Sequence, residues 1–451
     1  MTASEKSRTS RRAFIQAGAA GAIAAAGAST LGFDALGSAV GATQSRARGP
    51  HPTLAPVKDR ATGLELINLP QGFEYTTFGW TTDPMDDGIA TPSAHDGTAA
   101  FRERGSSKVQ LVRNHEQGGL GGAFATGMTY DPMAEGGTTT IEFDLETQQF
   151  TGARASLAGT IRNCAGGPTP WRSWLSCEET AVVNGSTLHG YVFEVPVDGV
   201  STGQPLRDLG RFEHEAAAVD PRTGYVYLTE DATPSGLYRF IPNVAGDLAA
   251  GGRLQMLAIG DSSYVTYADV APKDYGQVHW VDIDFPDPAT EQPSTVSQGI
   301  TKGGAQFERL EGAWFFDGKL YFDSTSGGPA RGQVFRLNPN TDKLKMIYSS
   351  PGIEVLDSPD NITVSPRGGI ILCEDGSGPS FLQGLDSRGR IFPFAENRVV
   401  LNGERGFVGD FSTSEWTGAT FEPREGKWMF VNIQTPGITF AITGPWRSLG
   451  L

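Results

Sequence analysis

Histidine and cysteine are scarce in this sequence, whose 451 residues include six His and three Cys. A His-rich zinc site is therefore not expected. Neither His115-Glu116 nor His214-Glu215 is followed by a second His at the four-residue spacing of zinc-protease helices. The odd number of cysteines (Cys164, Cys177 and Cys373) argues against a disulfide framework. A Cys164–Cys177 bridge stays an alternative, because the two residues fall at opposite ends of one predicted hairpin.

Other catalytic signatures are missing as well. The sequence has no Gly-x-Ser-x-Gly elbow, so a serine hydrolase would have no nucleophile. The glycine-rich stretch 118–137 lacks the Lys-Ser/Thr ending of a P-loop. Acids outnumber Lys and Arg by 51 to 36, and the net charge of −15 disfavours nucleic acid as a partner.

Residues 1–42 have the pattern of an export signal rather than of a folded segment. Arg11 and Arg12 form a twin-arginine motif, a small-residue apolar run covers residues 17–31, and residues 40–42 (Val-Gly-Ala) offer a cleavage site. The alternative is a single membrane anchor, but the run is short and rich in Gly and Ala. We therefore expect export by the twin-arginine translocase to the periplasm or the medium, with no stable membrane anchor. A linker at 43–58 and one domain at 59–451 would follow.

Short apolar runs that end in oxygen-bearing side chains recur along the chain. Six of them are found, at residues 109–116, 174–179, 226–231, 320–323, 370–375 and 429–434. A second polar series opens the apolar run before each of these and consists of His95-Asp96, Asn163, Glu215, Glu311, Asp360-Asn361 and Glu415. Turn sequences such as Asp317-Gly318 lie between the paired runs, as in β-hairpins.

The hairpins predict an all-β fold with about six propeller blades. In an antiparallel hairpin the start of the first strand and the end of the second lie at the same edge, so both polar series should converge on one central face. Residues 63–80 are expected to form a first strand that closes the ring. The segment 243–302 lengthens one interval between blades and is interpreted as an insertion, with a lid over the polar face as one possibility.

The converging carboxylates indicate bound cations. Acids crowded at one face repel each other unless positive charge lies between them. A thiol among carboxylates suits a transition metal, while pockets of oxygen alone suit calcium.

Several motifs together resemble the PhoX-type alkaline phosphatases over roughly residues 60 to 445. The motifs are residues 307–314 (FERLEGAW), 358–361 (SPDN), 414–418 (SEWTG), 431–437 (VNIQTPG), 114–116 (NHE) and 176–179 (SCEE), together with the twin-arginine leader. The resemblance implies a six-bladed propeller, an iron–calcium cluster and hydrolysis of small phosphate esters. A bridging oxygen of that cluster would serve as the nucleophile.

The resemblance also assigns residues. It implies Cys177, Glu311 and Glu415 as ligands on the iron side of the cluster. On the calcium side it implies Glu116, Glu178, Glu179, Glu215, Asp360 and Asn361. Active members carry an Arg two residues before the Glu that Glu415 matches, and here that position is Thr413. Loss of this Arg predicts weaker binding of phosphate monoesters, unless Arg331, Arg367 or Arg405 takes its place.

Two other functions remain alternatives at this point. One is a calcium-dependent lactonase, which also gathers acids around an axial cation. The other is a secreted propeller, with calcium ions that only hold the blades together. Metal content would separate the three: iron with several calcium ions, one calcium ion, or calcium without iron. The protein is expected to be a monomer.

Overall fold

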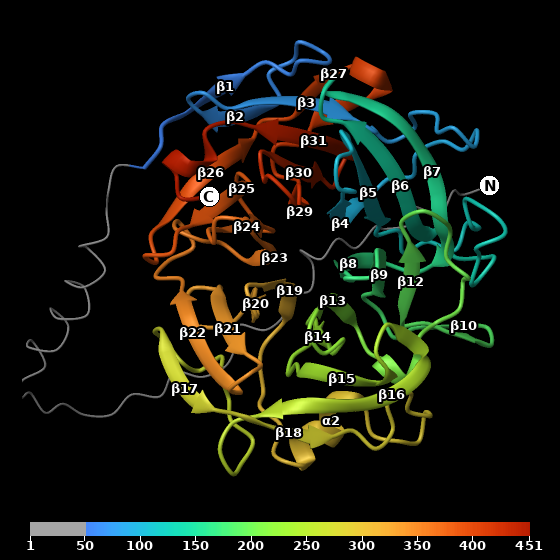
Figure 1. Ribbon diagram of the computed structural model, residues 1–451, viewed down its shortest axis with the longest axis vertical. Helices are drawn as coiled ribbons and strands as arrows, with labels where there is room; N and C mark the ends of the chain where they lie inside the picture. Colours follow the sequence, from blue (N-terminus) through green and yellow to red (C-terminus); the bar gives the residue numbers. More distant parts are fainter. Residues whose placement is uncertain (1–50) are drawn as a thin grey trace, which may run out of the picture. The chain divides into compact units, whose positions relative to one another are not determined.

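The computed structural model describes residues 51–451, which form a ring of six β-sheets (Figure 1). The innermost strands surround a central channel. The predicted all-β propeller with six blades is confirmed. Blade 1 contains β4 (His95–Phe101), β5 (Lys108–His115), β6 (Gly136–Asp144) and β7 (Gln149–Thr160). Blade 2 contains β8 (Asn163–Pro168), β9 (Ser173–Glu178) and β12 (Val192–Pro196). Blade 3 contains β13 (His214–Val219), β14 (Val226–Glu230), β15 (Leu237–Val244), β16 (Asp247–Ala258) and β18 (His279–Asp282).

The remaining blades follow in chain order around the ring. Blade 4 contains β19 (Leu310–Phe316), β20 (Lys319–Ser324), β21 (Gln333–Asn338), β22 (Lys343–Ser349) and β17 (Lys273–Gln277). Blade 5 contains β23 (Pro359–Val364), β24 (Ile370–Glu374), β25 (Phe381–Leu385), β26 (Ile391–Asn397), β2 (Ile67–Pro70) and β1 (Leu54–Val57). Blade 6 contains β29 (Trp416–Phe421), β30 (Trp428–Ile433), β31 (Ile438–Thr443) and β3 (Glu74–Phe78).

A few short elements complete the described part of the chain. They are the hairpins β10 (Val183–Asn184) with β11 (Thr187–Leu188) and β27 (Val400–Asn402) with β28 (Val408–Asp410), the helix α2 (Thr295–Thr301), and the single turns η4 (Arg207–Leu209), η5 (Glu404–Gly406) and η6 (Trp446–Ser448). No helix in residues 51–451 is long and apolar enough to cross a membrane. The predicted leader, with Arg11 and Arg12, lies outside the described residues.

The ring closes through strands from both ends of the described chain. β3 pairs with β31 over five residues, from Glu74 with Thr443 to Phe78 with Thr439, which confirms the closing strand predicted within residues 63–80. The fully buried Arg113 of blade 1 ties this seam, because its guanidinium donates to the Gly79 carbonyl at 3.0 Å and to Thr439 Oγ1 at 2.7 Å. β1 pairs with β2, so the fold begins inside the segment predicted as a linker.

The segment 243–302 extends two neighbouring blades at their outer edges. β18 pairs with β16 in blade 3, and β17 pairs with β22 in blade 4. The loop before β17 adjoins the loop that leads into β19, where Thr266 N–H donates to the Gln306 carbonyl at 2.9 Å. Most of the predicted insertion therefore builds outer sheet edges (Figure 1). The lid over the polar face stays a prediction, and only the loop before β17, which contains Thr266, lies where it could form one.

Side chains of the strands point toward the neighbouring blades and form the core there. In β9, Leu175 and Cys177 belong to the apolar cluster shared with blade 3, while Trp174 belongs to the cluster shared with blade 1. Strand side chains alternate between the two faces of a sheet, and in a propeller both faces are covered by blades. The channel is therefore reached mainly by residues at the ends and irregularities of the innermost strands.

Candidate metal centre

All six blades end in the same backbone arrangement at one mouth of the channel. The residue directly after each second strand donates its N–H to the carbonyl of the residue directly before each innermost strand, at 2.8–3.2 Å. We call the residues before the innermost strands entry residues, and they are Ala94, Arg162, Glu213, Arg309, Ser358 and Glu415. We call the residues after the second strands exit residues, and they are Glu116, Glu179, Asp231, Thr325, Asp375 and Gln434.

A β-bulge lies two residues further along the innermost strand in blades 1 to 5. The register between the first two strands shifts at this point in these five blades, whereas in blade 6 it shifts after Thr417, which pairs with Asn432. A bulge leaves a residue without a ladder partner and redirects its side chain. The residues at this position, which we call bulge residues, are Asp96, Cys164, Glu215, Glu311 and Asp360, and their counterpart in blade 6 is Thr417.

Entry, bulge and exit residues together form three groups that could hold metal ions. In each group the ligand atoms lie within 4.8 Å of one another. The groups are Asp96 with Glu116 and Cys164, then Cys164 with Glu179 and Glu215, and finally Asp360 with Asp375 and Glu415. Adjacent blades thus share ligands, and Cys164 belongs to two groups.

Two arginines and one glutamine connect these acids across blades. Arg162 Nη2 lies 2.9 Å from Glu116 Oε1 and 2.5 Å from Glu179 Oε2. Arg309 holds Asp231 with Nε and Nη2 at 2.8 and 3.0 Å and also reaches Glu311 at 2.9 Å. Gln434 Nε2 donates to Asp96 Oδ2 at 2.9 Å and to Glu116 Oε2 at 2.8 Å.

Burial makes the remaining negative charge costly. Desolvation, with nearby Glu179, Asp360 and other acids, raises the pKa of Glu215 well above its usual range. Glu215 Oε2 is buried and has no hydrogen-bond partner among the described residues, while its Oε1 accepts from Cys164 Sγ at 3.1 Å. Burial and adjacent acids likewise raise the pKa of the Cys164 thiol. A buried carboxyl oxygen without a partner, next to other acids, fits a bound cation. The positive charge would favour the ionised forms of Glu215 and Cys164.

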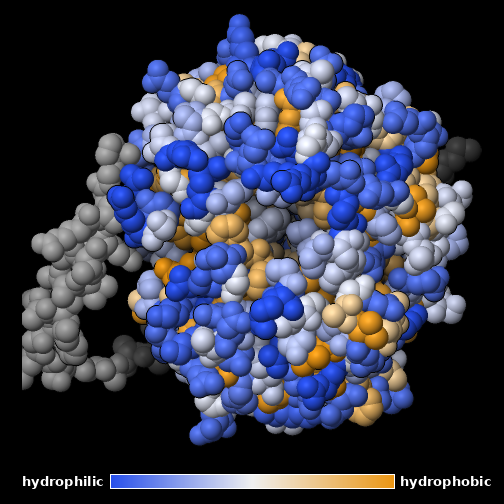
Figure 2. Space-filling model, viewed as in Figure 1, coloured by the Kyte–Doolittle hydropathy of each residue, from blue (hydrophilic) through white to orange (hydrophobic). Residues whose placement is uncertain are grey.

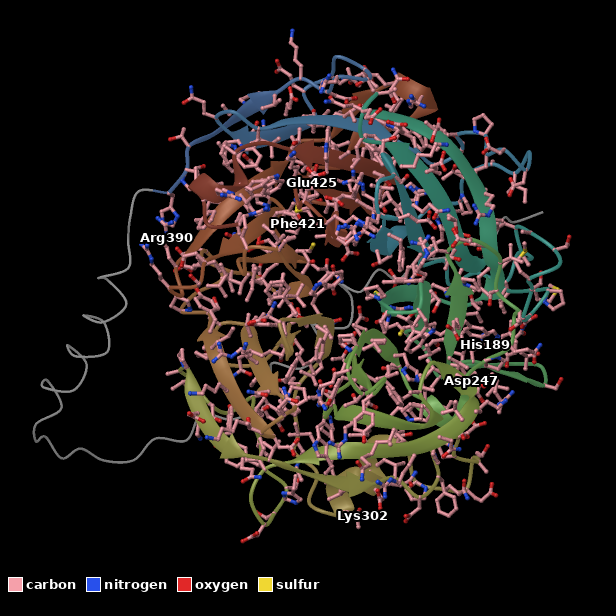
Figure 3. The ribbon with its side chains drawn as sticks, viewed as in Figure 1. His189, Asp247, Lys302, Arg390, Phe421 and Glu425 are labelled. Carbon is pink, nitrogen blue, oxygen red and sulfur yellow. The ribbon has the colours of Figure 1, made fainter. Side chains whose placement is uncertain are left out.

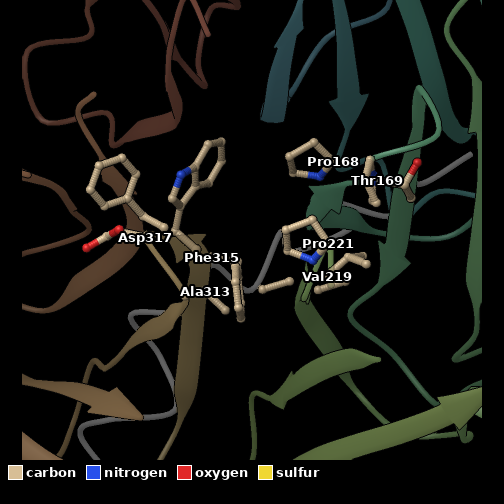
Figure 4. Close-up of a pocket in the computed structure, with 13 residues that line it drawn as sticks. Pro168, Thr169, Val219, Pro221, Ala313, Phe315 and Asp317 are labelled. Atoms are coloured by element: carbon tan, nitrogen blue, oxygen red, sulfur yellow. The ribbon is translucent and has the colours of Figure 1, made fainter. Parts of the chain in front are cut away.

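The other mouth of the channel has a different character. A cavity of about 430 Å³ lies there, at the ends of β8, β13 and β19, and proline and aromatic side chains such as Pro168 and Phe315 line it (Figure 4). Figure 2 shows the hollow at the centre of the ring on the face in view. The ligand groups belong to the opposite ends of the same strands.

The family model of alkaline phosphatase PhoX matches residues 52–156 and 144–437. The chain belongs to this family. The family identified from the motifs is thereby confirmed, and with it the assignment of the protein as a phosphatase that hydrolyses phosphate esters. This membership decides against the lactonase and non-catalytic alternatives.

A solved structure supports the propeller fold. Pseudomonas fluorescens PhoX in complex with vanadate, a transition-state analogue, aligns with a TM-score of 0.64 at 17% identity, covering 87% of this chain and 97% of that chain. A gluconolactonase from Xanthomonas campestris (TM-score 0.41, 11% identity, 88% and 98% covered) and virginiamycin B lyase from Staphylococcus aureus (0.41, 11%, 82% and 99%) also match. No curated protein sequence matches the chain.

The three candidate groups include most of the acids named from the sequence. Glu116, Glu179, Glu215, Asp360 and Glu415 belong to the three groups. Glu311 is a buried bulge residue, and burial together with Asp231 raises its pKa well above the usual range. Asn361 follows Asp360 on β23 and is buried, but it is in none of the groups found among residues 51–451.

Cys177, the thiolate that the resemblance assigned, lies outside the three candidate groups. It lies one residue before the end of β9, completely buried in the apolar cluster with Val192 and Tyr238, and faces blade 3. At the equivalent positions of blades 1 and 3, Asn114 and Thr229 hold backbone carbonyls of the next blade's bulge residues, at 2.9 and 2.5 Å. Cys177 thus occupies a position that contacts the next blade, and the thiol of the metal groups is Cys164. All three cysteines are free, so the Cys164–Cys177 bridge is wrong.

Glu178 is directed away from the channel as well. Its carboxylate accepts from the backbone N–H groups of Ile161, Gly190 and Tyr191 and contacts His189 Nδ1 at 2.7 Å. His189 lies toward the outside of blade 2 (Figure 3). Glu178 therefore ties the loop after β9 to its own blade, and its four partners account for its burial without a metal.

Asp96, Asp231 and Asp375 belonged to the converging polar series but were not assigned as ligands. Cys164, Arg162 and Arg309 were not singled out for this site from the sequence. The signal was available in the spacing. Bulge residues follow entry residues by two positions in blades 1 to 5, so the residue after Asn163 is equivalent to the one after His95.

The three arginines considered as substitutes for the one missing at Thr413 have other contacts or are exposed. Thr413 is exposed in the loop before β29. Arg367 lies in the hairpin turn after β23, at the end of the blade away from the ligand groups. It donates to the carbonyls of Leu451 and Gly426. Arg405 binds Asp83 at 2.5 Å and lies over the Trp80 ring. Arg331 is exposed in the loop after β20.

Proposed function

We propose that this phosphatase uses iron and calcium held at the entry, bulge and exit residues of its propeller. The observation that carries the proposal is the convergence of three ligand groups at one mouth of the channel. Membership of the PhoX family supports phosphate monoesters as substrates.

The donor types distribute the metals between the two sides of the channel. Cys164, shared by two groups with Asp96, Glu116, Glu179 and Glu215, offers a thiolate among carboxylates and suits iron. The group of Asp360, Asp375 and Glu415 contains only oxygen donors and suits calcium. Glu311 lies near Asp360 and would extend either site.

The bound cations would supply Lewis-acid stabilisation of the negative charge that develops on the phosphoryl group. The protein's own residues hold the arrangement. Gln434 links Asp96 with Glu116, and Arg162 links Glu116 with Glu179, so these acids are oriented before a substrate arrives. The backbone hydrogen bonds between exit and entry residues fix their spacing in every blade.

The test is elemental analysis of protein exported with its native leader, together with hydrolysis of an aryl phosphate before and after treatment with a chelator. We expect iron with more than one calcium ion per chain, and activity that falls on chelation and returns with calcium. Full activity in metal-free protein would contradict the proposal. Calcium without iron would contradict the assignment of iron to the groups with Cys164 and would leave the calcium site standing.

The leader carries a separate proposal about location. Arg11 and Arg12 with the apolar run after them support export by the twin-arginine translocase to the periplasm or the medium. Replacing both arginines with Lys should retain the protein in the cytoplasm with the leader uncleaved, as immunoblots of cell fractions would show. We also propose that the exported domain is a monomer, which sedimentation would test.

A further inference from the structure

Arginines recur at the mouth of the channel opposite the ligand groups, which we call the far mouth. The turns that join the innermost strand to the second strand of each blade, which we call the first turns, border this mouth. Across the six first turns basic residues outnumber acids by seven to five, whereas in the whole chain acids outnumber Lys and Arg by 51 to 36. Five of these turns contain an arginine, namely Arg102, Arg172, Arg222, Arg367 and Arg424.

The turns themselves do not require these side chains. In blades 3, 5 and 6 the first turn contains Pro-Arg after a polar residue, at 220–222, 365–367 and 422–424. The side chain of that polar residue accepts the backbone N–H of the arginine in all three turns, at 2.9, 3.2 and 2.9 Å. Any residue except proline would supply this N–H. The guanidinium group of each arginine is therefore available for another purpose.

A second cavity adjoins the one described above at the far mouth. Its volume is about 400 Å³, and it shares Pro168, Thr169, Trp314 and Phe316 with the cavity of about 430 Å³. Trp314 and Phe316 are partly exposed at the end of β19. Figure 4 shows the first cavity between this strand end and the prolines Pro168 and Pro221 of blades 2 and 3. Cavities of this size and apolar character suit small organic ligands.

The charged side chains that line the second cavity are all arginines, namely Arg102, Arg172 and Arg424. Their partners leave part of each guanidinium group free. Arg102 binds Glu422 through Nη1, Arg172 binds Asp198 through Nε and Nη2, and Arg424 donates only from Nε, to the Arg102 carbonyl at 2.9 Å. Within residues 51–451, Nη2 of Arg102, Nη1 of Arg172 and both Nη atoms of Arg424 donate no hydrogen bond.

We propose that the far mouth binds a small organic anion, an acyl or aryl carboxylate. Its apolar body packs against Trp314 and Phe316, which belong to both cavities, and its carboxylate accepts hydrogen bonds from the free nitrogens of Arg424 and Arg102. The charge is complementary, because no acid lines the second cavity and only Asp317 lines the first. This site is separate from the ligand groups and does not depend on the proposed function.

The test is calorimetric titration of the metal-loaded protein with naphthoate, with its neutral analogue naphthamide, and with decanoate below its micelle concentration. We expect one site per chain for a carboxylate and binding of naphthamide about tenfold or more weaker than that of naphthoate, because charge-assisted hydrogen bonds are lost. The stronger of the two carboxylates identifies the apolar body as aryl or acyl.

Variants connect the binding to this place. Arg424→Gln should weaken naphthoate about tenfold and leave naphthamide unchanged, whereas Phe316→Ala should weaken both alike. Arg253→Gln is the control, because Arg253 is an exposed arginine on the outer strand β16 and lines neither cavity. Metal content and hydrolysis of an aryl phosphate should stay at wild-type levels in Arg424→Gln.

Three results would overturn the proposal. The first is the absence of carboxylate binding at millimolar concentration. The second is equal affinity for naphthoate and naphthamide, or an Arg424→Gln variant that binds naphthoate as wild type does. The third is flotation of the protein with vesicles of phosphatidylglycerol when neither free carboxylate binds, because the far mouth would then contact a lipid surface instead of a small anion.

Discussion

The two cysteines of blade 2 show how strongly position within a strand decides the role of a side chain. Cys164 is a bulge residue on the innermost strand, with acids of three blades around it. Cys177 lies on the second strand and is surrounded by apolar side chains. The same thiol is a candidate ligand in one place and part of the core in the other.

This difference gives opposite expectations for two matched variants. Cys164→Ser should lose iron and the visible absorption of a thiolate–iron bond, with little change in the melting temperature of the metal-free protein. Cys177→Ser should keep both but lose about 1–3 kcal/mol of stability, because a hydroxyl replaces a thiol in an apolar environment. Absorption spectra and thermal melts of the two variants would check this. An absorption band lost in Cys177→Ser and kept in Cys164→Ser would restore the assignment made from the sequence.

Glu230 occupies the position of Glu178 in blade 3, at the end of the second strand. It accepts from Tyr238 Oη at 2.6 Å and from Gly236 N–H at 3.0 Å, yet burial raises its pKa to about 8 from an ordinary 4.5. The folded protein therefore binds more protons than the unfolded chain between these values. The stability that this group contributes is complete below pH 4.5 and is lost as the pH rises toward 8.

Glu230→Gln should remove this dependence, because an amide resembles the protonated acid and cannot ionise. We expect the melting temperature of the variant to exceed that of wild type by a few degrees at pH 8 and to match it at pH 4.5. Thermal melts across this range in chelator would measure the difference. An equal shift at both ends would mean that packing, and not ionisation, distinguishes the two side chains.

At the scale of elements, the sequence predicted the hairpins and their common polar edge because apolar runs and turn residues are local signals. The pairing of His95 with His115 and of Asn163 with Glu178 agrees with that prediction. It did not predict the bulges, since an extra residue in a ladder depends on the partner strand. The bulge brings Cys164 into the candidate groups, whereas Cys177 and Glu178, which were assigned by resemblance, lie outside them.

Contacts between blades depend on the residue before the end of each second strand. Asn432 donates from blade 6 to the Asp96 carbonyl in blade 1 at 2.9 Å and to Thr98 Oγ1 at 3.0 Å. Asn432→Ala should cost about 2–3 kcal/mol of stability, because buried polar groups lose their partners. The exposed turn residue Asn340 is the control, and Asn340→Ala should have little effect in denaturant unfolding. Equal midpoints for both variants would show that packing alone joins the blades.

At the scale of the molecule, the acids of all blades meet at one mouth, and only Arg162 and Arg309 offset them among the entry, bulge and exit residues. Cations that bind the folded ring and not the unfolded chain should stabilise it by several kcal/mol. We expect a calcium chelator to lower the melting temperature strongly and added calcium to restore it, whereas magnesium should restore less because it prefers a smaller octahedral site. A melting temperature that does not respond to the chelator would show that the two arginines suffice.

The seam between β3 and β31 also bears on how the protein is made. Phe78 leaves the ribosome long before its partner Thr439, so β3 has an unpaired edge during almost all of synthesis. Blade 6 cannot be completed until the last part of the chain has emerged, and contacts this distant in sequence form slowly. A nascent chain that stalled before β31 would therefore lack a closed ring. Under the export proposed above, such a chain would carry the same N-terminal sequence as the finished protein, and only its unfinished fold would distinguish the two.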